Sequence, residues 1–478
     1  MQKNSLYKNS LYFILYRVIN VIYPLVTATY VSRVLKPDGV GQISIAQTVV
    51  IFLTACACLG IPNYGTREVS KVDNRDELSK LFSELFITNL LSTAIFAALF
   101  YSIIPLLSND LEINKTLYYV EGIILVLNFI NVDWFYQGKE EFRYITIRSC
   151  IVKFLSIFAI FGFVKNEGDI VVYAIVFVIA YAGNYLFNVI NLRKYVYFTL
   201  RGITPKKHIK LVLILAITYI SNEIYVTVDT VMLGFMSGNS AAAYYSNAMK
   251  LIKILVNVCT AMGTALLPRL SRVLYDGDSL GFERITKKAV HVLMWITLAC
   301  VTGIILTSQH LIIVLFGYDF APSIGIIRVL CFLIVFRSFS NLFLQILLCT
   351  NQEKITTYGY FSGMILNIIL NYFFIPYWGG EGAAIASVLS ELYICLFLFF
   401  FLRKKTKIKV DPKYLASLAI SITCMVICVQ TTKIWAFSHF MSLAIEIAIG
   451  FLSFVFVNMI SKNEVLYLFL KKYGGSSK

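Results

Sequence analysis

The amino-acid sequence predicts an all-α, polytopic membrane protein. The 478-residue chain is 58% hydrophobic and 14% charged, with a mean hydropathy of +0.76, whereas soluble domains carry about 25% charged residues. Its apolar residues fall in blocks of about 20, the length of helix that crosses a hydrocarbon layer of about 30 Å. Only helices and closed barrels satisfy their backbone hydrogen bonds in lipid, and uninterrupted blocks of this length indicate helices.

The apolar blocks divide into fourteen predicted transmembrane helices. We interpret the first block as a retained helix rather than a signal peptide, because it lacks a small-residue cleavage pattern and contains Arg17 and Pro24. The predicted spans are 11–32, 40–63, 81–105, 117–137, 146–165, 170–192, 211–236, 241–268, 289–308, 323–350, 355–376, 383–402, 414–430 and 440–460.

The distribution of lysine and arginine predicts the orientation of these spans. Of the 42 basic residues, 31 fall in the termini and in every second loop, 5 fall in the opposite loops and 6 lie inside spans. This asymmetry follows the positive-inside rule and predicts that both termini are cytoplasmic. Cytoplasmic loops beside anionic lipids explain the net charge of +16, so we expect membrane lipids and no nucleic acid as partners.

The ten cysteines all lie inside predicted spans, without a metal-binding spacing to the four histidines. We interpret them as small apolar side chains rather than as a disulfide framework. The sequence contains no G-x-x-x-x-G-K-[ST] loop, so we expect no nucleotide hydrolysis. We also expect no cofactor, no metal and no enzymatic activity, because the longest predicted loops leave little room for a catalytic site.

A weak internal repeat predicts how the spans are grouped. A shift of 201 residues places "REVSKV" (67–72) over "PRLSRV" (268–273) and "GQISIAQ" (41–47) over "AAYYSNA" (242–248). Six spans per copy would give two copies with the same orientation, related by an axis along the membrane normal. We therefore predict two pseudo-symmetric six-helix bundles around a central cavity. The predicted parts are an N-terminal lobe at 1–200, a C-terminal lobe at 201–405, and two additional helices with a cytoplasmic tail at 406–478.

Four segments resemble the polysaccharide repeat-unit flippases of the Wzx type, within the multidrug/oligosaccharidyl-lipid/polysaccharide exporter superfamily. They are "GIPNYGTREVSK" (60–71), "DWFYQGKEEFRY" (133–144), "LLPRLSR" (266–272) and "LNYFFIPYWGGEGAAIAS" (370–387). The resemblance implies a bacterial cytoplasmic membrane protein that moves a polyprenyl-pyrophosphate-linked oligosaccharide from the inner to the outer leaflet. We also expect coupling to H⁺ or Na⁺ and a polysaccharide polymerase as a partner. The polymer stays open between capsule and O-antigen.

Two other transport functions stay open within the same superfamily, a multidrug exporter and a lipid II flippase. Drug exporters are expected to favour acidic cavities, but the six basic residues inside spans are balanced by six acids. The two additional C-terminal spans fit the polysaccharide branch better than a twelve-span exporter. A membrane glycosyltransferase would need a large extramembrane loop with catalytic residues. The predicted spans are joined by loops too short for this.

Polar and basic residues deep inside spans are the candidate substrate-binding residues, because such residues are costly in lipid and usually face a bundle interior. Arginine and lysine suit a pyrophosphate or an acidic sugar. The alternative is that each base pairs with a nearby acid or extends to the membrane interface. The predicted cavity residues are Arg17, Asn20, Lys153, Lys250, Lys253, Asn257, Arg337 and Asn341.

Two acids in the seventh predicted span, Glu223 and Asp229, are the candidates for ion coupling. Glu223 is the most central acid of the chain, and a buried carboxylate there can bind a proton or a sodium ion. The alternative is a structural ion pair between Glu223 and one of the cavity bases.

Residues at the cytoplasmic ends of the spans form the third candidate group. We expect Trp134 to be an interfacial anchor. We expect Asp133, at the end of the fourth span, to bond to Arg143 or Arg148, since an acid is unfavourable at a helix C-terminus. The predicted cytoplasmic latch or gate residues are Asp133, Trp134, Arg67, Glu68 and Arg269, with solvated loop charge as the alternative for the last three.

Overall fold

The computed structural model describes residues 2–110, 114–350, 352–403, 411–435, 437–461 and 463–466. Within these ranges every regular element is helical, and no strand is present. Eleven of the fourteen predicted spans coincide, within two residues, with a helix or with part of one, and the other three, 40–63, 117–137 and 323–350, are divided between successive helices. Nine helices of the described chain are long and apolar enough to cross a membrane. The all-α, polytopic class is therefore confirmed.

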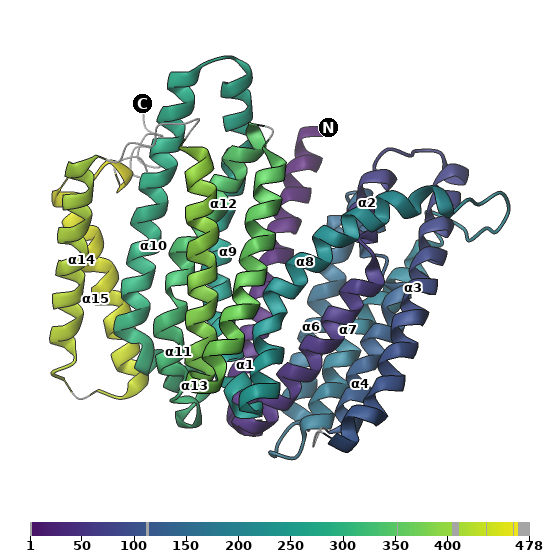
Figure 1. Ribbon diagram of the computed structural model, residues 1–478, viewed down its shortest axis with the longest axis horizontal. Coiled ribbons are helices and arrows are strands. Elements are labelled where there is room, and N and C mark those ends of the chain that lie inside the picture. The colour runs from purple at the N-terminus through teal and green to yellow at the C-terminus, as the bar shows by residue number, and fades with distance from the viewer. Residues whose placement is uncertain are drawn as a thin grey trace. The chain divides into compact units, whose positions relative to one another are not determined.

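The chain forms two compact units, residues 1–243 and 244–478. In the first unit, α1, α6 and α7 pack on one another, and α4 packs on α1, α3 and α7. The helices of this unit, shown in Figure 1, are α1 (Gln2–Cys58), α2 (Ile61–Val69), α3 (Arg75–Asp110), α4 (Lys115–Val126), η1 (Leu127–Ile130), α5 (Asp133–Gly138), α6 (Phe142–Phe163), α7 (Ile170–Leu192) and α8 (Lys206–Ser237).

Two of the longest helices each contain a kink, which accounts for two pairs of predicted spans. The backbone of α1 leaves helical geometry at Lys36, with φ 58°. Pro37 follows, and the residue before a proline is disfavoured in the α conformation. In α13 (Glu353–Leu402) the kink lies at Gly379, with φ 50°. Each kink falls in the short loop predicted between two spans, after 32 and after 376.

The predicted second span ends earlier than expected. The helix stops at Cys58 because Leu59 and Gly60 take positive φ values of 49° and 75°, a conformation that ends a helix. A separate short helix, α2, then carries the segment that the sequence analysis assigned to a span end and a loop.

The predicted fourth span, 117–137, is wrong in its last third. Helix α4 ends at Val126, a 3₁₀ turn follows, and Asn131 is extended before α5 begins at Asp133. The physical reason is a buried polar network: Asn128 Nδ2 donates to Asn89 Oδ1 (3.4 Å) and to Thr93 Oγ1 (3.3 Å). Asp133 therefore lies in the first turn of a helix, where an acid is favourable, and not at a helix C-terminus.

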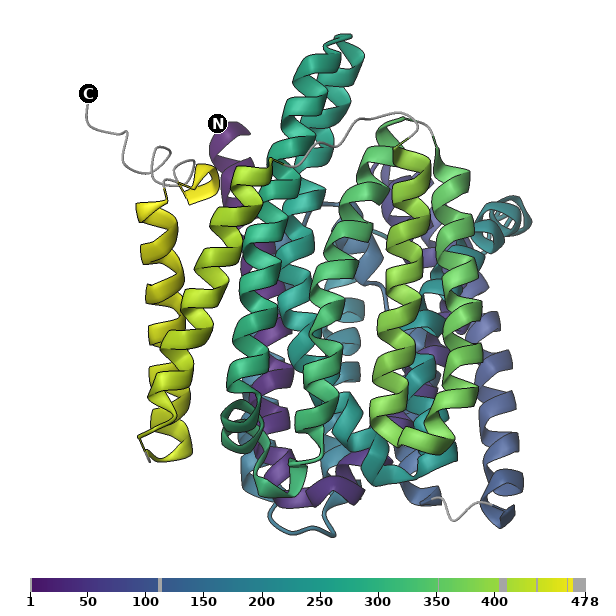
Figure 2. The ribbon, with the colours of Figure 1, turned by 60° about the vertical axis from the view of Figure 1, so that its left-hand side comes forward.

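The second unit contains the remaining helices and an antiparallel C-terminal pair, α14 and α15, that packs on α10 (Figure 2). An apolar cluster of Tyr414, Leu418 and Phe454 fills this joint, and the Tyr414 hydroxyl donates to the His291 carbonyl. The helices are α9 (Asn239–Tyr275), which begins in the first unit, α10 (Ser279–Phe316), η2 (Tyr318–Phe320), α11 (Ser323–Leu330), α12 (Phe332–Cys349), α13, α14 (Pro412–Thr432) and α15 (His439–Ile460).

The predicted lobe boundaries at 200 and 405 stay predictions. The compact units divide at another point, because α8 packs on α1 and α2 and so belongs to the first unit. The ten cysteines are free thiols, half of them buried, as expected for small apolar side chains.

Candidate functional site

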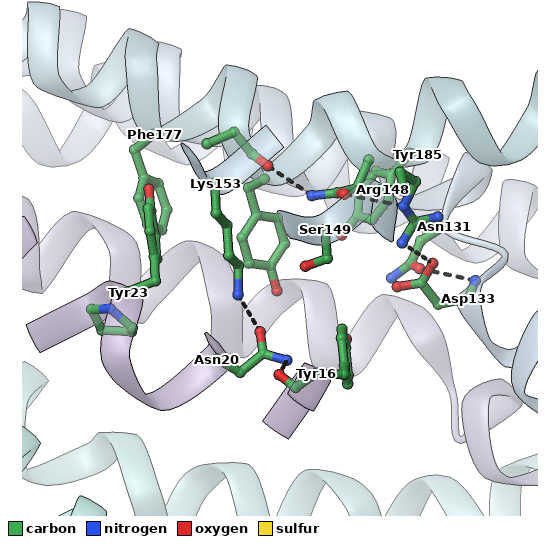
Figure 3. Close-up of a pocket in the computed structure, with 14 residues that line it drawn as sticks. Tyr16, Asn20, Tyr23, Asn131, Asp133, Arg148, Ser149, Lys153, Phe177 and Tyr185 are labelled. Atoms are coloured by element: carbon green, nitrogen blue, oxygen red, sulfur yellow. Dashed lines mark hydrogen bonds and ion pairs between the residues drawn. The ribbon is translucent and has the colours of Figure 1, made fainter. Parts of the chain in front are cut away.

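A pocket of ≈ 350 Å³ lies inside the first unit (Figure 3). Its walls come from the first half of α1, from α6 and from α7, and residues Asn131 and Asp133 line one end. All three wall helices are apolar overall, and α6 and α7 are each long and apolar enough to span a membrane. The polar groups of this pocket therefore lie among apolar helices.

The α1 and α7 walls place aromatic rings around the pocket. Tyr16, Asn20 and Tyr23 are spaced by four and three residues, so they share one face of α1. On α7, Tyr181 and Tyr185 are four residues apart and also line the pocket. Tyrosine offers an apolar ring and a polar hydroxyl, so these walls can contact both parts of an amphipathic ligand.

The middle of the pocket holds a lysine with neutral partners. Lys153 Nζ donates to Asn20 Oδ1 and lies 5.3 Å from the centroid of the Tyr23 ring. Asn20 Nδ2 in turn donates to the Tyr16 carbonyl at 2.8 Å, and Ser156 Oγ donates to the Tyr23 hydroxyl at 3.0 Å. No carboxylate of the described residues forms an ion pair with Lys153. The ammonium extends into the pocket rather than to a helix end (Figure 3).

The end of the pocket holds an arginine with an acidic partner. Arg148 Nη2 lies 3.0 Å from Asp133 Oδ1, and its Nε donates to Asn184 Oδ1 at 3.1 Å. Asn188 Nδ2 donates to the same Asp133 oxygen, and the guanidinium lies 5.7 Å from the centroid of the Tyr144 ring. The Arg148 side chain is only 6% exposed. The predicted bond from Asp133 to Arg148 is confirmed.

Trp134 is not an interfacial anchor: its side chain is 4% exposed and belongs to a core between α2, α3 and α5. The indole stacks on Phe82, and a β-carbon built on Gly65 would lie 2.4 Å from Trp134 Cε3. Thr66 Oγ1 donates to the Trp134 carbonyl at 3.1 Å. The interfacial interpretation fails because the break before α5 turns the tryptophan inward, onto α2.

The other predicted gate residues lie on helices. Glu68 on α2 accepts from Arg67 Nε at 3.1 Å and from Lys71 Nζ at 2.9 Å, and both bases are more than half exposed. Burial pushes the pKa of Glu68 up, but the hydrogen bonds from Lys71 and Arg67 outweigh it and hold this pKa below its ordinary value. Arg269 is exposed on α9, in the second unit. Their predicted role as a gate stays a prediction.

The predicted cavity residues of the second unit lie on two helices. On α9, Lys250 Nζ donates to Asn247 Oδ1 at 3.0 Å and lies within electrostatic range of Lys253. Asn257 is exposed one turn further along this helix. On α12, Arg337 lies within electrostatic range of the Tyr360 hydroxyl, as does the buried Glu391. Asn341 shares α12 with Arg337. The side chain of Arg17 lies outside the described side chains.

The candidate ion-coupling residues both lie on α8. Asp229 is buried, at 5% exposure, and Glu223 is partly buried. Glu223 lies within electrostatic range of Cys58 and of Tyr181, and Tyr181 lines the pocket. The central acid of α8 therefore lies in the neighbourhood of one pocket wall.

Several pocket residues were missed by the sequence analysis. Arg148 was considered only as a partner of Asp133 and not as a cavity residue, whereas it lies on α6 and lines the pocket. The tyrosines were not considered, because aromatic residues in apolar blocks usually pack in a core. Their spacing carries a usable signal: the polar or aromatic residues of α7 that line the pocket are Phe177, Tyr181, Asn184 and Tyr185, on one face of a helix otherwise rich in valine and isoleucine.

Three curated relatives match most of the chain. The protein described as "Putative O-antigen transporter" from Shigella dysenteriae is 23% identical over 401 residues, covering 82% of this chain and 98% of the relative. The protein with the same description from Escherichia coli K12 is 23% identical over 414 residues, covering 84% and 97%. The capsular polysaccharide biosynthesis protein CapF of Staphylococcus aureus is 21% identical over 412 residues, covering 83% and 99%.

Two solved transporters share the fold. The lipid II flippase MurJ, in an inward closed conformation, aligns with a TM-score of 0.78 at 16% identity, covering 94% of this chain and 98% of MurJ. An inward-facing multidrug resistance MATE transporter of the MOP superfamily aligns with a TM-score of 0.65 at 15% identity, covering 82% and 97%.

Two family models match the sequence itself. The model described as "MatE" covers residues 215–373. The model described as "Polysaccharide biosynthesis protein" covers residues 6–274, more than half of the chain. The chain is therefore a polytopic membrane protein that belongs to the polysaccharide biosynthesis protein family.

Proposed function

We propose that this protein is a flippase that moves a polyprenyl-pyrophosphate-linked oligosaccharide from the inner to the outer leaflet of the bacterial cytoplasmic membrane. The family supports this function, as do the relatives described as O-antigen transporter and capsular polysaccharide biosynthesis protein. The product would be a repeat unit for a surface polysaccharide, which a polymerase then extends. The 31 basic residues in the termini and alternate loops support cytoplasmic termini.

Lys153 is the observation that carries this proposal. Its ammonium extends into an aromatic pocket among apolar helices, and its described hydrogen-bond partner is the neutral Asn20. A cation at such depth is costly unless an anion compensates it. The pyrophosphate of a lipid-linked sugar is such an anion, and it arrives only with the substrate. Tyr16 and Tyr23 supply rings and hydroxyls around the same space.

We propose that the bases of the second unit also contact the substrate. Lys250 and Lys253 lie on one helix, and Arg337 lies on another. Together with Asn257 and Asn341 they would contact the pyrophosphate or acidic sugars. The guanidinium of arginine can donate two parallel hydrogen bonds and the ammonium of lysine carries a compact charge, so both bind the oxygens of a pyrophosphate or a carboxylate.

Ion coupling is proposed for Glu223, with Asp229 on the same helix. The proximity of Glu223 to Tyr181 supports coupling between an ion site and the pocket. Binding of H⁺ or Na⁺ to this acid would change the charge beside the pocket and so bias the affinity for an anionic headgroup.

The two other transport functions share the fold. The match of the "MatE" model to residues 215–373 favours a multidrug exporter, but a cation such as Lys153 repels the cationic drugs that such exporters carry. A lipid II flippase would use the same cation and is separated from the proposed function by its sugar.

The decisive experiment is reconstitution in proteoliposomes with a labelled lipid-linked oligosaccharide, scored by its appearance in the opposite leaflet. We expect transport by the wild type and a loss of about tenfold or more in Lys153→Ala, a factor that corresponds to about 1.4 kcal/mol. Lys165→Ala, a loop lysine, is the matched control and should transport normally. Transport of lipid II or of a cationic drug, with none of the oligosaccharide lipid, would assign one of the alternative functions instead.

A further inference from the structure

An apolar groove of ≈ 430 Å³ lies between α6 and α7, outside the polar pocket. Ser156 is the only polar residue among the twelve that line it. Large exposed side chains border it, including Leu155 at 62%, Ile179 at 64% and Phe187 at 52% exposure. The groove therefore offers contacts to a flexible apolar chain and almost no hydrogen bond.

Small residues on the two helices keep this groove open. Ala159 lies on α6, and Ala180 and Gly183 lie on α7. A β-carbon built on Gly183 would have one neighbour within 4 Å, Val152 Cγ1 at 4.0 Å. The seam between the helices is thus not filled by side chains of the protein itself at this level.

The groove and the polar pocket share a wall. Ala180 lines both of them. Ser156 lines the groove and donates to the hydroxyl of Tyr23, which lines the pocket. On α6, Val152 lines the groove while the next residue, Lys153, lines the pocket. An apolar compartment and a cationic compartment therefore lie back to back across one helix seam.

We infer that the groove holds the isoprenoid segment next to the pyrophosphate while the headgroup occupies the pocket beside Lys153. This inference rests on the proposed function, because that function supplies an anionic head joined directly to an isoprenoid tail. The shared wall of the two compartments selects this occupant, because it places an apolar groove directly beside a cationic pocket. A phospholipid acyl chain would fill the groove equally well, but its own headgroup stays at the membrane surface, away from the middle of α6.

The test compares two tail lengths on one oligosaccharide pyrophosphate headgroup in proteoliposomes. Gly183→Leu fills the groove, and Gly162→Leu is the matched control, since a β-carbon there has nothing within 4 Å. We expect Gly183→Leu to slow transport of the long-tailed substrate by about fourfold or more, the effect of withdrawing one methylene from an apolar contact. Transport of a short-tailed analogue, and of both substrates by Gly162→Leu, should match the wild type.

A photoactivatable isoprenoid pyrophosphate gives a second measurement that does not depend on transport. We expect labelling of residues 152–187 that excess unlabelled isoprenoid pyrophosphate displaces and excess phospholipid does not. Equal displacement by phospholipid would overturn the inference, as would wild-type rates for both tails in Gly183→Leu. If the wild type transports neither the long-tailed nor the short-tailed substrate, the proposed function is wrong. The inference, which rests on that function, is then wrong as well.

Discussion

The two cations of the pocket differ in their partners. Arg148 is committed to the protein, with Asp133 at 3.0 Å and Asn184 at 3.1 Å. Lys153, on the same helix, is held by the neutral Asn20 and the ring of Tyr23. The arginine therefore balances an internal charge at the end of the pocket, whereas the described partners of the lysine are neutral, as the proposed binding of an anionic headgroup requires. Counting the bases inside membrane helices does not distinguish these two roles, and identifying their partners does.

Removing the acid of the Arg148 pair should have the largest effect on stability. Asp133→Ala leaves a guanidinium that is 6% exposed without its carboxylate, and breaking a buried pair in this way costs about 3–5 kcal/mol. Thermal unfolding in detergent measures the loss. Asp73→Ala, in an exposed loop, is the control. Unfolding of the two variants at the same temperature would show that the pair is not structural.

Removing the charge of Lys153 should spare the fold and slow transport. Lys153→Met keeps the length of the side chain, so we expect unfolding at or above the wild-type temperature, together with a transport rate lower by about tenfold or more. Lys153→Arg should restore much of the rate, since a cation returns to the pocket. A stable Lys153→Met that transports at the wild-type rate would contradict the difference drawn between the two cations.

An acidic partner for Lys153 should form an ion pair with it, as Asp133 does with Arg148, and so reduce its availability to the substrate. Asn20→Asp places a carboxylate where the amide oxygen now accepts from Lys153. An ion pair of about 0.5–1 kcal/mol would compete with the ligand and slow transport by about two- to fivefold. Asn20→Ala, which removes the acceptor without adding charge, should have a smaller effect. Equal rates for the two variants would mean that the charge of Lys153 is not what the substrate contacts.

The smallest effect is expected for the surface pairs of Glu68 on α2. The pKa of Glu68 lies below its ordinary value of 4.5, so its stabilising contribution is present above that pH and is lost as the pH falls through the lowered pKa. Glu68→Gln should change the stability at pH 7 by less than about 1 kcal/mol, because both bases are exposed. A larger loss of stability would show that Glu68, like Asp133, contributes substantially to the stability of the fold.

The helices could be predicted from the sequence because each apolar block has the length of a membrane span, and eleven of the fourteen blocks fall on a single helix. The break before Asp133 could not, because it depends on hydrogen bonds between Asn128, Asn89 and Thr93, which are distant in sequence. Lys153 and Asn20 were recognisable as polar residues in apolar blocks. That Asn20 would be the partner of Lys153 was not, because their helices meet only in the folded chain.

The absence of a side chain at Gly65 lets Trp134 pack on α2, and this contact helps to position the neighbouring Asp133. A side chain at Gly65 would occupy the place of the Trp134 ring, since its first carbon would lie 2.4 Å from that ring. At the other end of α5, a β-carbon built on Gly138 would lie 2.8 Å from the carbonyl oxygen of Thr66. Helices α2 and α5 are therefore in close contact at both ends of α5. This contact joins the helix that carries Arg67 to the helix that carries Asp133, the carboxylate paired with Arg148.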